Sequence, residues 1–309
     1  MDLNLSPKFP RVFAEAEGAG IYNWAASDSP VLAQAKLAAG KLIMKPGGLA
    51  LPHYADCSKI GYVLEGNCGV GLTLQARTKD KTVFMDLRKG DIIPIPKESI
   101  SWWYNHGNSD LEIVFMGDSS NAYFPAEITY FFLAGAMAPF AAFSPGFIAK
   151  TYNLSIETAE QLGNSQKSGL LIKVDEEEAK GIPKPNQDLV NIWTRNIDSS
   201  NPDVEVENGG KSTTLTAIQF PFLEEVGLSF CRLVLEPNAT RAPGYASESR
   251  MFFVAKGSGK VQIVGIQGKL VLNTKVEAGQ IFVVPKLFMV TISADEGGME
   301  LASIVKSAR

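Results

Sequence analysis

The sequence contains very little histidine and cysteine. Only two of its 309 residues are histidines, His53 and His106, and only three are cysteines, Cys57, Cys68 and Cys231. A first-row metal is normally held by three or four protein ligands, chiefly histidine, cysteine and carboxylate side chains. A metal centre built on several histidines is therefore excluded, and we expect neither a metal nor another cofactor. The odd number of cysteines also argues against a fully paired disulfide framework.

A strong excess of charge and a long apolar run are missing as well. The net charge is −4 and the isoelectric point is about 5.4, which does not favour a nucleic-acid partner. No apolar run reaches the roughly 18 residues that a membrane-spanning helix needs, so we expect no membrane partner. The start of the chain, MDLNLSPKFPRVF, lacks the cationic and apolar regions of a secretory signal. We therefore expect a cytoplasmic protein whose three thiols are free.

In place of these features the chain contains an internal repeat. The first copy, residues 42–66, reads LIMKPGGLALPHYADCSKIGYVLEG, and the second, residues 233–257, reads LVLEPNATRAPGYASESRMFFVAKG. Each copy is followed by a Gly-[Asp/Gln]-x-x-x-x-Pro turn and a closing strand, in residues 90–105 and 279–292. Repetition at this scale predicts two similar domains. The short Val-, Ile- and Phe-rich strands between Gly/Pro turns are typical of β-sandwiches and barrels.

Both repeats resemble the domains of the cupin superfamily. The first repeat keeps six framework positions of the cupin motifs, namely Gly48, His53, Gly66, Gly90, Pro96 and Asn105. The resemblance implies an all-β fold of two tandem jelly-roll β-barrels, with a short helical segment after the first barrel and at the junction.

The metal-ligand positions of that resemblance carry other residues. Metal-binding cupins hold one divalent ion with three histidines and a glutamate. In the first repeat the second histidine position carries Ala55 or Asp56, the glutamate position Lys59 and the third histidine position Ser101. In the second repeat the first histidine, glutamate and last histidine positions carry Gly244, Arg250 and Val290. The resemblance therefore implies the cupin framework without its metal.

Within the cupins the chain resembles the legumin-type (11S) seed globulins and their smaller plant relatives. Residues 127–174 carry the likeness best, through a Phe-Leu-Ala-Gly turn at 132–135, a helix entry at 143–147 and a Gly-x-x-Ile-Lys-Val strand at 169–174. Members of that family continue after the last strand into a helical arm that clasps the neighbouring subunit. This sequence stops before such an arm, so we expect self-association, as a dimer or trimer, to be weaker.

The domain boundary is expected in a polar, proline-bearing stretch. We assign residues 1–175 to the first barrel with its helical exit, 176–200 to a linker and 201–309 to the second barrel. The helical exit is expected over residues 155–162, with Ser155 as its N-cap. The acidic triplet at 176–178 is interpreted as a solvated face of the linker.

Each barrel interior offers a group of candidate site residues. In the first barrel we consider His53, Lys59, Tyr62 and Ser101 as catalytic acid–base candidates, with Trp103 as a ligand-binding residue. In the second barrel the ligand-binding candidates are Tyr245, Glu248, Arg250 and Phe252. The alternative is that Lys59 and Arg250 point outward from strand ends and that Trp103 is core packing.

Three functions are compatible with these residues. The first is a nutrient-reservoir-type globulin relative without a metal site. The second is a metal-independent isomerase, cyclase or lyase of plant specialised metabolism, in which barrel residues act as acid and base. The third is a small-molecule-binding protein that uses a barrel cavity without turnover. The sequence leaves open whether the protein is an enzyme, and it names no substrate.

Overall fold

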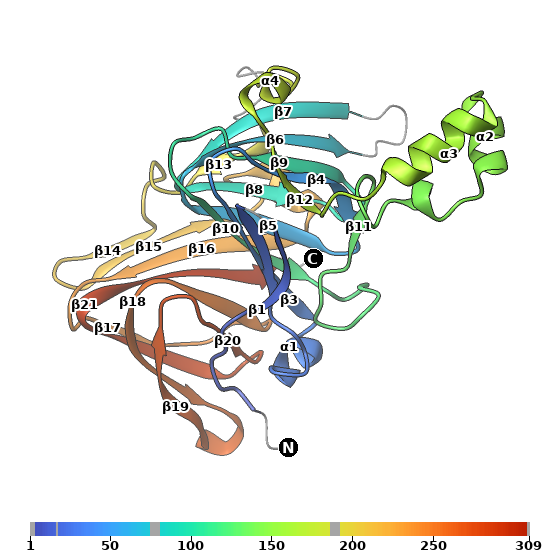
Figure 1. The fold of residues 1–309 in the computed structure, drawn as a ribbon. Coiled ribbons are helices and arrows are strands. Elements are labelled where there is room, and N and C mark those ends of the chain that lie inside the picture. Colours follow the sequence, from blue (N-terminus) through green and yellow to red (C-terminus); the bar gives the residue numbers. More distant parts are fainter. Residues whose placement is uncertain (1–3, 17, 75–80, 186–191, 308–309) are drawn as a thin grey trace.

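The computed structural model describes residues 4–16, 18–74, 81–185 and 192–307. Two β-rich halves lie against each other, and a helical hairpin projects from one of them (Figure 1). We call the half built from strands β1 to β13 the first β-domain and the half built from β14 to β21 the second β-domain. Among the described residues, the helices lack the length and the apolar character of a membrane span.

The first β-domain is a sandwich of two antiparallel sheets. One sheet has the order β1-β2-β3-β10-β5-β8-β13, and the other has the order β11-β4-β9-β6-β7, with β12 pairing with β4. The strands are β1 (Arg11–Ala16), β2 (Ala19–Asn23), β3 (Leu37–Met44), β4 (Gly48–Ala55), β5 (Ser58–Glu65), β6 (Asn67–Leu74), β7 (Lys81–Arg88), β8 (Asp91–Ile95), β9 (Ile100–Tyr104), β10 (Leu111–Asp118), β11 (Tyr130–Phe132), β12 (Leu171–Lys173) and β13 (Arg195–Asn196). The expected jelly roll is present as two separate sheets and not as one closed ladder.

The second β-domain is one sheet with the order β14-β15-β16-β21-β18-β19, to which β17 and β20 pair at β21 and β18. Its two longest strands pair over most of their length, with register shifts between Val254 and Lys256 and between Gly257 and Gly259 that let the sheet bend. The strands are β14 (Val204–Val206), β15 (Gly210–Leu215), β16 (Leu228–Leu235), β17 (Thr240–Gly244), β18 (Arg250–Val264), β19 (Leu270–Glu277), β20 (Ile281–Val284) and β21 (Met289–Lys306).

Equivalent glycines end the third strand segment of each sequence repeat. Gly66 has φ +79° and Gly257 has φ +75°, a left-handed conformation that side chains other than glycine rarely adopt. A Cβ at Gly66 would lie 2.6 Å from the carbonyl oxygen of Asp110, and one at Gly257 would lie 2.1 Å from that of Gly298. The turn geometry therefore requires glycine at both positions, which explains why the repeat keeps it.

The largest helical segment is a hairpin between β11 and β12 of the first β-domain. The hairpin consists of α2 (Pro145–Tyr152) and α3 (Ile156–Ser165), and Ser155 caps α3 by accepting a hydrogen bond from the backbone N–H of Thr158. The N-cap prediction is thus confirmed, and the helix extends three residues beyond its expected end at residue 162. The remaining helices are α1 (Pro30–Ala35), α4 (Glu176–Ala179), η1 (Pro139–Ala141), η2 (Pro221–Glu225) and η3 (Ile266–Gly268).

The segment predicted as a linker contains two ordered pieces. Its acidic triplet lies in α4, where Asp175 and Glu178 form a capping box. At its other end β13 pairs with β8 of the first β-domain. Residues 186–191 of the predicted linker lie outside the described residues.

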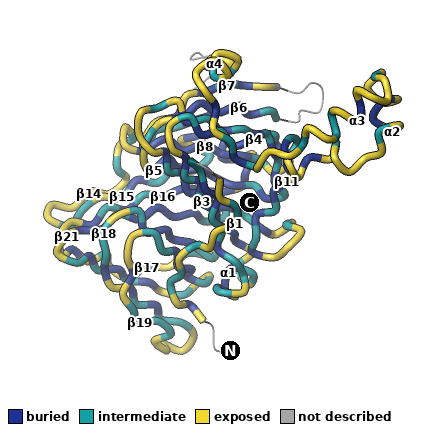
Figure 2. The backbone as a smooth tube through the Cα atoms, viewed as in Figure 1, coloured by how far each residue is buried: buried dark blue, intermediate teal, exposed yellow. Residues whose placement is uncertain are grey.

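The two β-domains share one continuous hydrophobic core (Figure 2). Trp24 of the first β-domain lies edge-on to Phe253 of the second, with ring centroids 6.1 Å apart. Nearby, Arg232 forms ion pairs of 2.7 Å with both Asp198 and Glu300. Because the buried face of each domain is completed by the other, the halves form a single packed body.

Candidate functional site

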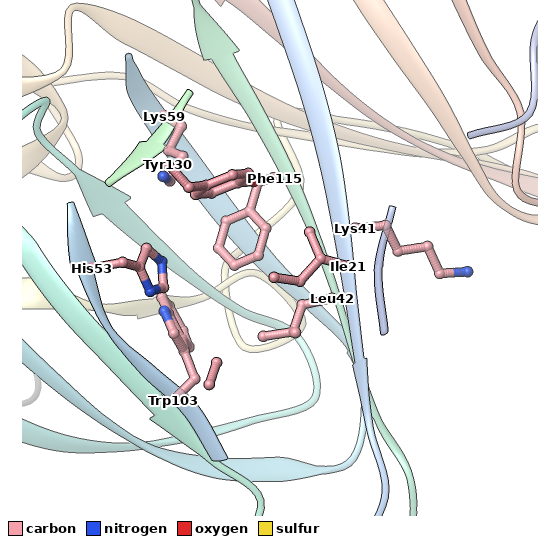
Figure 3. A pocket seen from close by; sticks show the side chains of 9 residues that line it. Ile21, Lys41, Leu42, His53, Lys59, Trp103, Phe115 and Tyr130 are labelled. Atoms are coloured by element: carbon pink, nitrogen blue, oxygen red, sulfur yellow. The ribbon is translucent and has the colours of Figure 1, made fainter. Parts of the chain in front are cut away.

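A small cavity lies between the two sheets of the first β-domain. Its volume is about 20 Å³, little more than the space that one water molecule needs. Strands of both sheets contribute to its wall (Figure 3), and the lining residues are Ile21, Lys41, Leu42, Ala50, His53, Lys59, Trp103, Phe115 and Tyr130. The amine of Lys41 points away from the cavity and pairs with Glu112 at 2.7 Å. The interior is therefore filled largely by its own side chains.

His53 lies on β4 opposite Ser101 of β9. It is 5% exposed, and its Nδ1–H donates a hydrogen bond of 2.7 Å to the carbonyl oxygen of Leu51. Burial, followed by the charge of Lys59, lowers the pKa of His53 to about 4. The imidazole is therefore neutral at pH 7.

Lys59, on β5, is a buried amine that points into the same cavity (Figure 3). It is 3% exposed, and its Nζ lies 5.2 Å from the ring centre of Tyr130 and 5.8 Å from that of Phe115. Burial lowers the pKa of Lys59 to about 8. The outward-pointing alternative for Lys59 is thus wrong, and aromatic faces are its main surroundings.

Ser101 and Trp103 alternate with Trp102 along β9. Ser101 and Trp103 face the interior, where the indole Nε1–H of Trp103 donates to Oγ of Ser101 at 3.3 Å. The ring of Phe115 lies edge-on to that of Trp103, with centroids 5.4 Å apart. Trp103 is 1% exposed, as a core residue is.

Tyr62 lies apart from the other candidates. It is on β5, but its hydroxyl donates to Oε1 of Glu300 at 3.2 Å and its ring packs against Phe230 of the second β-domain. The structure therefore brings His53, Lys59, Ser101 and Trp103 together and places Tyr62 at the contact between domains.

The second β-domain has a smaller cavity of about 10 Å³, lined by residues of β17, β18, β20 and β21 and of the turns between them. Arg250 lines it together with Glu248 and Tyr245, whereas Phe252 is buried beneath and stacks on Phe282 with centroids 4.9 Å apart. Tyr245 is 70% exposed at the rim. The outward-pointing alternative for Arg250 is wrong too, because the guanidinium group lies over the ring of Phe252, 5.7 Å from its centre.

The cupin metal positions do not converge on a ligand set. Asp56, one of the two residues at the second histidine position, accepts hydrogen bonds from the backbone N–H groups of Tyr123 and Thr129 and so holds a loop. His106 pairs with Asp86 at 3.0 Å on the surface. Within the described residues, no group of three or more histidine, cysteine, aspartate or glutamate side chains could hold a metal ion.

Sequence reasoning missed two residues that shape these cavities. Tyr130 comes from β11, far along the chain from the cupin motifs, and its pKa is raised by burial beside His53 and Lys59. Arg241 lies three residues before Gly244 and fills part of the space above that glycine. Arg241 could have been suspected, because it is a basic residue close to Gly244, a metal-ligand position without a ligand side chain. Tyr130 had no signal in the sequence.

This framework of two cupin-like domains is shared with known proteins. The model of the cupin family matches residues 6–160 and 195–309, and the chain belongs to this family. Within it the chain is a legumin-type, 11S-globulin-like bicupin. It is 26% identical to the 12S seed storage protein CRD of Arabidopsis thaliana over 331 residues, covering 89% of this chain and 73% of the relative.

Two solved structures show the same architecture. Procruciferin, the 11S globulin of Brassica napus, superposes with a TM-score of 0.87 at 25% identity, over 100% of this chain and 85% of that one. The 11S globulin of Wrightia tinctoria, for which an auxin binding site is described, superposes with a TM-score of 0.84 at 22% identity, over 98% and 83%. The fold class and the globulin resemblance are thereby confirmed.

Proposed function

We propose that this protein is a nutrient reservoir of the seed-globulin type, a stable double cupin whose amino acids are the stored material. The observation that carries this proposal is the match of both domains, over nearly the whole chain, to 11S and 12S seed storage proteins. A reserve protein needs a compact, durable fold and no reactive site, and the continuous core across both domains supplies such a fold.

The interior of the first β-domain also favours storage over turnover. Its cavity of about 20 Å³ is far smaller than the roughly 300 Å³ or more of a ligand pocket. His53 is neutral at pH 7 and donates to a backbone carbonyl, while Tyr62 lies outside the cavity. An acid–base enzyme would need room for a substrate beside these groups.

The proposal is tested by following the protein in the seeds of the plant that encodes it. A reserve protein accumulates during maturation and disappears on germination. Cell fractionation of the same tissue tests the cytoplasmic location that we propose on the basis of the three unpaired, buried cysteines.

Self-association is the second part of the proposal, and the α2–α3 hairpin is the surface that supports it. The hairpin stands away from the β-domains (Figure 1), and its few internal contacts bury only Ile148, Ala149 and Ala159. Phe147 is 59% exposed and Ile156 is 53% exposed. Exposed aromatic and aliphatic side chains on a projecting element are typical of an interface between subunits.

Replacing both Phe147 and Ile156 by glutamate should convert the oligomer, a dimer or trimer, into a monomer of 33.4 kDa. Two charges in the centre of an apolar contact should raise the dissociation constant by about tenfold or more, and light scattering coupled to size exclusion measures the mass. Glutamate at the first turn of α3 suits the helix, so the hairpin should stay folded. Ile266→Glu, at an exposed turn of the second β-domain, is the matched control. A monomeric wild type, or a double variant of unchanged mass, would refute the role of the hairpin.

A further inference from the structure

Two arginines line the same small cavity of the second β-domain. Arg241 lies on β17 and Arg250 begins β18, and both line the cavity of about 10 Å³. A Cβ built on Gly244, the first histidine position of the cupin resemblance, would lie 3.3 Å from Nη2 of Arg241. Arg250 occupies the glutamate position. Two guanidinium groups thus stand where the cupin resemblance places a metal ligand pair.

Neither arginine has an acidic partner among the described residues. Nη1 of Arg241 and Nε of Arg250 are buried N–H donors without a hydrogen-bond acceptor. Glu248 lines the same cavity but forms no ion pair with either arginine in the described part of the chain. Burial, followed by the charge of Arg250, lowers the pKa of Arg241.

The contrast with Arg232 shows how unusual this arrangement is. Arg232 is partly buried too, but it is held by Asp198 and Glu300 at 2.7 Å. A buried donor without an acceptor costs free energy, and two like charges in a partly desolvated site add to that cost. An anion between the two guanidinium groups would relieve both penalties at once.

We propose that Arg241 and Arg250 form a binding site for a small oxyanion, a single carboxylate or phosphate group. The planar guanidinium fork matches the oxygen pairs of both groups. The enclosed space of about 10 Å³ is too small for the whole anion, so its oxygens contact the guanidinium groups from the rim, beside the apolar side chains of Val284, Pro285 and Val290. Any larger remainder of the ligand projects outward past the exposed ring of Tyr245.

The test titrates the full-length protein with inorganic phosphate and, separately, with malonate, at constant ionic strength made up with sodium chloride. Calorimetric titration and the shift in melting temperature are the readouts, since a ligand that binds only the folded state raises the melting temperature. A saturable response to phosphate alone identifies a phosphate site, and a response to malonate alone identifies a carboxylate site. Either response supports the proposal.

Arg241→Gln and Arg250→Gln should each raise the dissociation constant of the anion by about tenfold or more, because each removes charge-assisted hydrogen bonds. In anion-free buffer neither variant should melt below the wild type, since each removes the repulsion. Lys260→Gln, an exposed charge on the same strand β18, is the matched control and should bind as the wild type does. A wild type without a saturable response to either anion, or a response kept by both arginine variants, overturns the proposal. Should one arginine variant not fold, the other decides the outcome.

Discussion

Replacing Trp103 by alanine should lower the free energy of unfolding by about 3–5 kcal/mol, the usual cost of removing a large aromatic side chain from a core. Trp103 is 1% exposed, packs edge-on against Phe115 and donates a hydrogen bond to Ser101. Its removal would leave a cavity between the two sheets of the first β-domain and an unpaired hydroxyl on Ser101. Urea unfolding followed by circular dichroism measures the loss.

The neighbouring Trp102 provides a matched control. It points to the other face of β9, where its ring lies over Gly71 and 6.0 Å from that of Phe84, and it is only half-buried. Trp102→Ala should therefore cost less, about 1–2 kcal/mol for the apolar area that it exposes. Equal losses for the two variants would contradict the assignment of Trp103 to the core.

Replacing Lys59 by methionine should stabilise the protein at pH 7. The pKa of Lys59 is lowered from 10.5 to about 8, so the unfolded chain binds this proton more tightly than the folded chain. The resulting penalty is fully present below pH 8 and fades as the pH rises towards 10.5, so wild-type stability rises with pH across this window. Methionine keeps the length of the side chain without the charge. The gain should be about 3 kcal/mol at pH 7 and about half of that at pH 9.5.

Urea unfolding of both proteins at the two pH values measures this difference. Lys275→Met, at an exposed position on β19, is the control and should change stability little at either pH. A destabilised Lys59→Met variant, or a gain that does not shrink at pH 9.5, would show that the buried amine has a stabilising partner and would reopen a catalytic role for the cavity.

Much of the fold could be predicted because the same glycine turns occur in both sequence repeats. Gly66 and Gly257 are required by backbone geometry, and Ser155 caps its helix through a local hydrogen bond. Such features depend on a few neighbouring residues, so the sequence alone reveals them. The short pairing of β13 with β8 depends on a contact between segments that are distant in the chain, and no local pattern predicts it.

The candidate site was predictable only in part. Lys59 and Tyr62 are three residues apart on one strand, so they must point to opposite faces, and the alternation of side chains already separates them. The position of Arg241 could not be derived in this way, because a register shift between Arg241 and Gly244 interrupts the alternation. Irregular pairing of this kind is set by tertiary packing.

If this double cupin is a nutrient reservoir, its abundance should follow the life of the seed. Quantitative mass spectrometry should find the protein rising during maturation to a sizeable share of total seed protein and falling steeply in the first days of germination. A constitutive enzyme of the same seed serves as the reference. A protein that stays scarce throughout, or that persists unchanged after the seedling is established, would contradict the claim.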